Sequence, residues 1–141
     1  MSNTDALKLD NQLCFRLYAA SKEIIRQYSP LLDELDLTYT QYITLLVLWE
    51  KDQISVKELG NKLYLDSGTL TPLLKQLETK GYVARTRNNL DERNLIISIT
   101  KKGIELKKEA VKIPSEIVKC VKLNPDEAKN LYEILHKILG S

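Results

Sequence analysis

Residues 55–81, SVKELGNKLYLDSGTLTPLLKQLETKG, decide the fold. The first four of these residues have the form of a capping box and predict a short helix to about Leu63. After a turn over residues 64–66, leucines recur at helical spacing and predict a second helix, which Gly81 ends as a C-cap. Two short helices joined by a tight turn are typical of a helix-turn-helix, whose second helix enters the major groove of DNA.

The second helix of this pair carries small polar side chains on the side away from its leucines. Hydroxyl groups can bond bases or phosphates, and a proline ring can touch a thymine methyl group. Because a proline inside a helix removes a backbone hydrogen bond, we expect the first turn to be irregular. The candidate DNA-reading residues are Ser67, Thr69, Thr71, Pro72 and Lys75.

A basic hairpin is predicted directly after this helix. Residues 83–87 alternate and residues 95–99 are rich in isoleucine, which predicts two strands joined by a polar loop over residues 88–94. Basic wings can lie over phosphates and place an arginine in a narrow minor groove. We expect an aspartate in the loop to hold the guanidinium two residues later. The candidate wing residues are Arg85, Arg87, Asp91 and Arg93.

Long helices flank this region on both sides. Apolar residues at helical spacing predict one helix over about residues 7–32 and others over about residues 101–121 and 125–139. Helices are predicted to begin at the capping residues Thr38, Thr100 and Asn124. Pro30 is expected to loosen the last turn of the first helix, and Pro114 to disturb the helix over residues 101–121.

The predicted order of elements is therefore α-α-α-α-β-β-α-α, and the predicted fold class is mainly α (α+β). We expect a winged helix-turn-helix over about residues 38–100. The long terminal helices, over about residues 1–37 and 101–141, carry apolar stripes that need a partner. A length of 141 residues fits a single domain over residues 1–141.

Composition narrows the class of protein. The hydrophobic fraction of 43% and the charged fraction of 28% argue against disorder. A net charge of +2 is weak evidence for nucleic-acid binding, so the distribution of charge must decide. No apolar run approaches the roughly 18 residues of a membrane span, and the N-terminus lacks a secretory pattern. We therefore expect a cytoplasmic protein without membrane association, whose thiols are kept reduced.

The motifs resemble a known family. The run from Leu90 to Asn94, followed by Ser98-Ile99-Thr100, resembles the wing signature of MarR-type regulators, and the resemblance covers nearly the whole chain. Residues 13–18, 38–42 and 63–72 are similar to the organic hydroperoxide repressor subgroup. The resemblance implies a homodimer joined through its terminal helices and bound to a pseudo-palindromic operator in duplex DNA. It also implies that an oxidant such as an organic hydroperoxide acts on the N-terminal cysteine and releases the DNA.

The sequence contains two cysteines, Cys14 and Cys120. By the resemblance, Cys14 is the sensing thiol, and tyrosine hydroxyls at Tyr28 and Tyr39, with Tyr18 nearby, stabilise its thiolate. Tyr28 follows Cys14 by fourteen residues, or about 21 Å along one helix, so a contact between them requires the partner chain. Cys120 lies where some relatives carry a resolving cysteine; others use one cysteine and external thiols.

Alternatives remain open at this stage. An isolated cysteine such as Cys14 is most often a small buried hydrophobe. The chain can also be a MarR-type repressor released by a small phenolic ligand, or a thiol peroxidase. No catalytic triad or glycine-rich phosphate loop is present, so we expect neither an enzyme nor a cofactor. The single histidine, His136, and two scattered cysteines predict no metal site.

Overall fold

The computed structural model describes residues 3–88 and 91–140, without the side chains of residues 88 and 91–94. The chain begins with two short 3₁₀ turns, over Asp5–Leu7 and Leu9–Asn11. The elements that follow, in chain order, are α1 (Leu13–Asp33), α2 (Tyr39–Glu50), β1 (Ile54–Ser55), α3 (Val56–Leu63), α4 (Ser67–Thr79), β2 (Val83–Asn88), β3 (Asp91–Ile99), α5 (Lys101–Ala110), α6 (Ile113–Cys120) and α7 (Pro125–Leu139).

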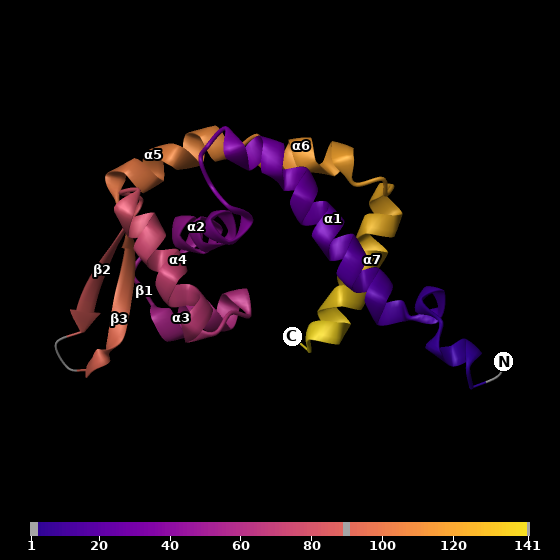
Figure 1. Cartoon of the computed structure of the whole chain (residues 1–141). Coiled ribbons are helices and arrows are strands. Elements are labelled where there is room, and N and C mark those ends of the chain that lie inside the picture. The colour runs from indigo at the N-terminus through magenta and orange to yellow at the C-terminus, as the bar shows by residue number, and fades with distance from the viewer. Residues whose placement is uncertain (1–2, 89–90, 141) are drawn as a thin grey trace.

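The molecule has the form of an arch (Figure 1). Helices α2, α3 and α4 and the hairpin of β2 and β3 lie at one end, whereas α1, α6 and α7 lie at the other. Helix α5 runs along the top of the arch between the two ends, and both chain termini lie away from the hairpin. The three strands form one antiparallel sheet in the order β1-β3-β2. The predicted winged helix-turn-helix is therefore confirmed.

The core lies between α2, α3, α4 and the sheet. The leucine face expected on α4 is fully formed, and its four leucines are between 0% and 6% exposed. Each buried leucine stabilises the fold by about 1.5–3 kcal/mol relative to an exposed one. The apolar side chains buried most completely, including one each from α1 and α6, are Leu32, Leu45, Leu48, Ile54, Leu59, Leu70, Leu74, Leu77, Ile97 and Ile113.

Short-range hydrogen bonds begin and end the helices much as expected. Thr38 and Gln41 form both bonds of a capping box at the start of α2. Ser55 accepts a hydrogen bond from the amide of Glu58, but the Glu58 carboxylate bonds Lys51 at 2.7 Å. The second bond expected of that capping box is therefore replaced by an ion pair. Gly81, with a φ of +86°, follows the C-terminus of α4 in the left-handed conformation that glycine adopts readily.

The structure corrects three boundaries. Helix α1 begins at Leu13 rather than near residue 7, because Gln12 is extended and two 3₁₀ turns precede it. Strand β3 begins at Asp91, so the loop predicted over residues 88–94 is too long. Backbone pairing extends the hairpin through polar residues because strand hydrogen bonds do not require apolar side chains. The predicted helix from residue 101 to 121 is two helices, α5 and α6, with the break just before Pro114.

Strand β1 was not predicted from the sequence. This strand has two residues, which pair with Ile96 and Ile97 of β3, and is too short to show an alternating pattern. Pro30, expected to loosen the last turn of its helix, lies inside α1, which continues to Asp33. Among the described residues, no helix is long and apolar enough to cross a membrane.

Candidate nucleic-acid interface and thiol site

Helix α4 presents the predicted reading residues to solvent. Ser67, Thr69, Thr71, Pro72 and Lys75 are all exposed, opposite the buried leucines. The helix runs from its first residue through the proline, so the irregular first turn that we expected is not seen. An internal proline costs about 3 kcal/mol, whereas the four buried leucines together contribute more than that. Burial of the leucine face therefore outweighs the missing backbone bond.

Hydrogen bonds at the start of α4 limit what its hydroxyls can do. Asp66 caps the helix by accepting a 2.7 Å hydrogen bond from the amide of Thr69, and this bond lowers the pKa of Asp66. The Thr71 hydroxyl donates to the backbone oxygen of Ser67 at 2.8 Å. Thr71 can therefore accept a hydrogen bond from a base but has already committed its proton.

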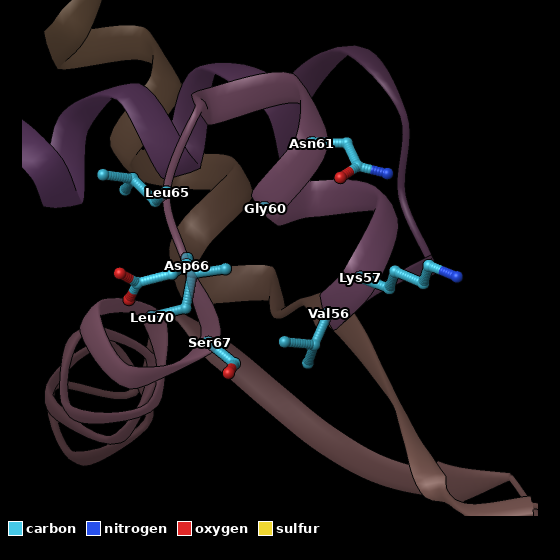
Figure 2. Close-up of a pocket in the computed structure, with 8 residues that line it drawn as sticks. All are labelled: Val56, Lys57, Gly60, Asn61, Leu65, Asp66, Ser67 and Leu70. Carbon is cyan, nitrogen blue, oxygen red and sulfur yellow. The ribbon is translucent and has the colours of Figure 1, made fainter.

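A shallow pocket of about 320 Å³ lies between α3 and the start of α4. Figure 2 shows Lys57 and Asn61 along α3, and Asp66 and Ser67 at the entry to α4. Lys57 and Asn61 are exposed and four residues apart, so they share one face of α3. Neither residue was predicted from the sequence as a DNA-binding candidate. Their spacing opposite the buried Leu59 is the signal that would have identified them.

The wing is tied to the reading helix by an ion pair. Arg85 of β2 donates a 3.0 Å hydrogen bond to Glu78 of α4, and the Arg85 side chain is 23% exposed. This bond lowers the pKa of Glu78. Arg87 lies two residues further along β2, on the same face, and is exposed. Arg85 is thus engaged within the domain, whereas Arg87 extends toward solvent.

The other two wing candidates can be placed only by their backbone. Asp91 and Arg93 both belong to β3, not to a loop, and Asp91 pairs with Asn88 of β2. Their side chains lie outside the described residues. The expected contact between them therefore stays a prediction.

Cys14 is the second residue of α1 and is exposed. The amide groups in the first turn of a helix have no acceptors within the helix, so they can donate hydrogen bonds to nearby groups. Tyr18 lies one turn further along α1, is 60% exposed, and has the Lys22 ammonium 5.1 Å from its ring centre. In the single chain, Cys14 is therefore not the small buried hydrophobe that the alternative interpretation expected.

Three tyrosines gather where α1 meets α2. The ring centre of Tyr28 lies 4.9 Å from that of Tyr39 and 5.8 Å from that of Tyr42. Burial, together with the neighbouring phenols, raises the pKa of Tyr28 to about 12, and burial also raises the pKa values of Tyr39 and Tyr42. All three therefore remain protonated near neutral pH and can donate hydrogen bonds. Tyr42 was missed in the sequence because its helical position reads simply as core.

One chain does not bring the tyrosine cluster and Cys14 together. Cys14 and Tyr28 lie on the same continuous helix, about 21 Å apart. Cys120 is the last residue of α6, is exposed, and donates weakly from Sγ to the backbone oxygen of Glu116 at 3.7 Å. Both cysteines are free. Among the described residues, no cluster of three histidine, cysteine or carboxylate side chains offers a metal site.

The terminal helices leave much apolar surface uncovered. Leu32 is the one described residue of α1 that is buried, and the residues of α7 are exposed or half-buried. In α1, α6 and α7, the large apolar side chains that are most exposed are Leu13, Tyr18, Val118, Tyr132, Ile134, Ile138 and Leu139. Large exposed apolar surfaces mark interaction sites, so these helices are candidates for contact with a partner.

The chain is similar in sequence to known transcriptional regulators. The family profile of "Transcriptional regulator SarA/Rot" matches residues 26–110. The chain is 50% identical to the organic hydroperoxide resistance transcriptional regulator of Bacillus subtilis over 135 residues, or 96% of this chain and 92% of that protein.

Two solved structures of AbfR, a protein of Staphylococcus epidermidis, are also similar. Reduced AbfR bound to DNA has a TM-score of 0.80 and 36% identity, and the match covers 98% of this chain and 96% of that chain. Disulfide-formed AbfR has a TM-score of 0.65 and 36% identity, with coverage of 96% and 92%.

The helix-turn-helix, the wing and these matches define a winged-helix transcriptional regulator. The chain belongs to the MarR-type family of such regulators, in the organic hydroperoxide repressor subgroup. The relatives matched here are transcriptional regulators rather than enzymes.

Proposed function

We propose that the chain is a homodimeric repressor that binds a pseudo-palindromic operator in duplex DNA and leaves it when Cys14 is oxidised. The observation that carries this proposal is the exposed Cys14 in the first turn of α1, in a chain half identical to an organic hydroperoxide resistance regulator. Reduced AbfR is bound to DNA, and AbfR also has a disulfide-formed state, which supports regulation by thiol chemistry.

Dimerisation accounts for the uncovered terminal helices, over about residues 1–37 and 101–141. Leu13 is 81% exposed and Tyr132 is 71% exposed, although large apolar side chains stabilise a fold only when they leave water. A second copy that packs against α1, α6 and α7 covers them. It also supplies the only route by which Tyr28 can approach a Cys14 thiol.

We assign the base contacts to residues of α4 and most phosphate contacts to residues of α3 and the wing. In the proposal, Ser67, Thr69, Thr71, Pro72 and Lys75 face the base edges and nearby phosphates of the major groove. Lys57, Asn61, Arg87 and Arg93 contact phosphates and fix the register of the domain on the duplex. Arg85 acts through Glu78 to hold the wing at a fixed angle to α4. Asp91 orients Arg93.

The sensing step is a two-electron oxidation of sulfur. The Cys14 thiolate attacks the terminal oxygen of an organic hydroperoxide, the O–O bond breaks, and the departing alkoxide takes a proton to become an alcohol. Cys14 becomes a sulfenic acid. The Cys120 thiol of the partner subunit then attacks this sulfur, which forms a disulfide and releases water.

The tyrosines prepare Cys14 for this reaction. Phenol groups that remain protonated donate to the thiolate and stabilise the charged form, which is the nucleophile. In the proposal, Tyr28 and Tyr39 of the partner subunit lie closest to the sulfur, because the two rings form one cluster, and Tyr18 lies at the edge of the site.

The experiment that tests the proposal is a comparison of operator affinity before and after treatment with an organic hydroperoxide. Wild-type protein should lose affinity and regain it on reduction, whereas Cys14→Ser should bind DNA and ignore the oxidant. If Cys14→Ser responds like the wild type, Cys14 is not the sensor.

A further inference from the structure

A buried glutamine of α2, Gln41, forms hydrogen bonds to the reading helix α4 and to the lysine that follows it. The Gln41 side chain is 1% exposed and uses both ends of its amide group. Its oxygen accepts hydrogen bonds from the backbone amide of Thr38 at 3.1 Å and from the Lys80 ammonium at 3.0 Å. Its nitrogen donates to the Gln76 side chain at 3.0 Å. Gln41 therefore bonds α2 to the C-terminal part of the reading helix.

Lys80 reinforces the same junction. It directly follows α4 and also donates to the backbone oxygen of Asp36, in the turn between α1 and α2. Gln76 and Lys80 therefore both bond the Gln41 amide group, and Lys80 also bonds the backbone at Asp36. Buried polar groups that are fully bonded resist displacement, because each lost bond leaves an unsatisfied group.

The same turn of α2 also carries the tyrosines. Tyr39 and Gln41 are two residues apart, which places them about 200° apart around the helix axis, on opposite sides. Tyr39 packs against Tyr28, whereas Gln41 bonds α4. The same turn of α2 therefore contacts the tyrosine cluster on one side and α4 on the other.

We propose that Gln41 is the positioning residue that carries a change at the tyrosine cluster to the reading helix, through its bonds to Gln76 and Lys80. This inference rests on the proposed function, because it assigns the route by which oxidation near the tyrosines alters DNA binding. Gln41 touches neither the thiol nor the DNA. It fixes the orientation of α4 relative to the first turn of α2.

The first test measures operator affinity of reduced and oxidised protein for wild type, Gln41→Met and Thr44→Val. Thr44 is a matched control, because it is 0% exposed on the same helix and its hydroxyl donates only to Thr40 of that helix, at 2.8 Å. Coupling between two sites commonly amounts to about 5- to 150-fold in affinity. We expect the oxidised-to-reduced ratio of dissociation constants to fall at least about fivefold in Gln41→Met and to stay at the wild-type value in Thr44→Val.

A purely structural role gives a different result. It weakens DNA binding in both redox states alike and leaves the ratio unchanged, and that outcome overturns the proposal. If Gln41→Met does not fold, Gln76→Met removes one bond of the network from the exposed side of α4. The ratio should then fall in the same direction, and a wild-type ratio in Gln76→Met contradicts the inference.

The second test needs neither DNA nor oxidant. Amide hydrogen exchange of residues 67–80 is measured in reduced Tyr39→Leu, Gln41→Met and the double variant. We expect Tyr39→Leu to accelerate exchange in α4, and to have no further effect once Gln41 is replaced. Additive effects, or no effect of Tyr39→Leu on α4, overturn the link. Should the wild type ignore oxidant, the proposed redox function fails, while this test still decides whether Gln41 couples the two regions.

Discussion

The ring of Tyr28 on α1 lies 4.9 Å from the ring of Tyr39 on α2, so two residues from separate helices form one phenol cluster. Burial raises the pKa of each above its ordinary value of 10.0, so both hydroxyl groups are protonated at neutral pH and remain so into the alkaline range. Cys14 lies about 21 Å from Tyr28 along α1. The cluster can therefore serve a thiol only when a second chain brings one to it.

Replacing either tyrosine by phenylalanine should slow the oxidation of Cys14. A hydrogen bond to a charged group is worth about 1.5–3 kcal/mol, so loss of one donor should lower the oxidation rate by about tenfold or more at neutral pH. Stopped-flow measurement of thiol loss for Tyr28→Phe and Tyr39→Phe checks this, with Tyr82→Phe in the winged helix as the control. Wild-type rates in both variants would exclude the tyrosines as donors.

Stability should fall at alkaline pH because of Tyr28. The folded-state pKa of about 12 lies above the ordinary value of 10.0, so the folded chain holds a proton that the unfolded chain loses between these values. The contribution of Tyr28 is thus fully present below pH 10 and is lost as the pH rises toward 12. Two pKa units correspond to about 2.7 kcal/mol, and solvent screening of the half-buried ring reduces the expected loss to about 1–2 kcal/mol.

Denaturant unfolding just below pH 10 and near pH 12 measures this loss. Tyr28→Phe should flatten the decline, whereas Tyr64→Phe, which removes the hydroxyl of a 61% exposed tyrosine outside the terminal helices, should leave it unchanged. An equally steep decline in Tyr28→Phe would place the alkaline transition elsewhere.

The two arginines of β2 should differ in how they support DNA binding. Arg87 is exposed, so Arg87→Ala should weaken binding and lower the salt dependence of the affinity by about one phosphate contact. Arg85 is engaged by Glu78, so Arg85→Ala should weaken binding through the wing angle and leave the salt dependence unchanged. Titration of affinity against salt concentration separates the two, and a lowered slope in Arg85→Ala would show that Arg85 leaves Glu78 to meet a phosphate.

Cys120 should capture oxidised Cys14 across the dimer. A disulfide requires the two Cα atoms to lie within about 7 Å of each other. We expect its formation to move the terminal helices and, with them, the two winged helix-turn-helix regions of the dimer. Non-reducing electrophoresis after mild peroxide treatment should show a covalent dimer for wild type and monomers for Cys14→Ser and Cys120→Ser. If Cys120→Ser still loses DNA reversibly at the wild-type rate, Cys14 acts alone, through sulfenic acid or a mixed disulfide with a small thiol.

Local signals in the sequence predicted the winged helix well. The capping box at Thr38 and the C-cap at Gly81 involve residues three or four apart, and both form as predicted. The leucine face of α4 needs only helical periodicity, and all four of its leucines are buried. Periodicity failed at the start of α1, because Leu7 and Leu9 fit the pattern but are exposed on 3₁₀ turns.

Contacts between segments that are distant in the chain could not be predicted from the sequence. The Glu78–Arg85 ion pair depends on how β2 packs beside α4, and the Gln41 network joins residues 35 and 39 positions apart. Neither leaves a periodic signal. Tyr42 is a similar case, since its role beside Tyr28 depends on the crossing of α1 and α2.

The most direct test of the central claim is a titration of the operator-bound wild-type protein with an organic hydroperoxide, with fluorescence anisotropy and intact mass recorded on the same samples. The account predicts that DNA release follows the oxidised fraction of Cys14 and is complete at about one equivalent of oxidant per subunit, since each thiol reacts once. Release while Cys14 remains reduced would contradict it, as would continued consumption of hydroperoxide in large excess over Cys14 in the absence of added reductant.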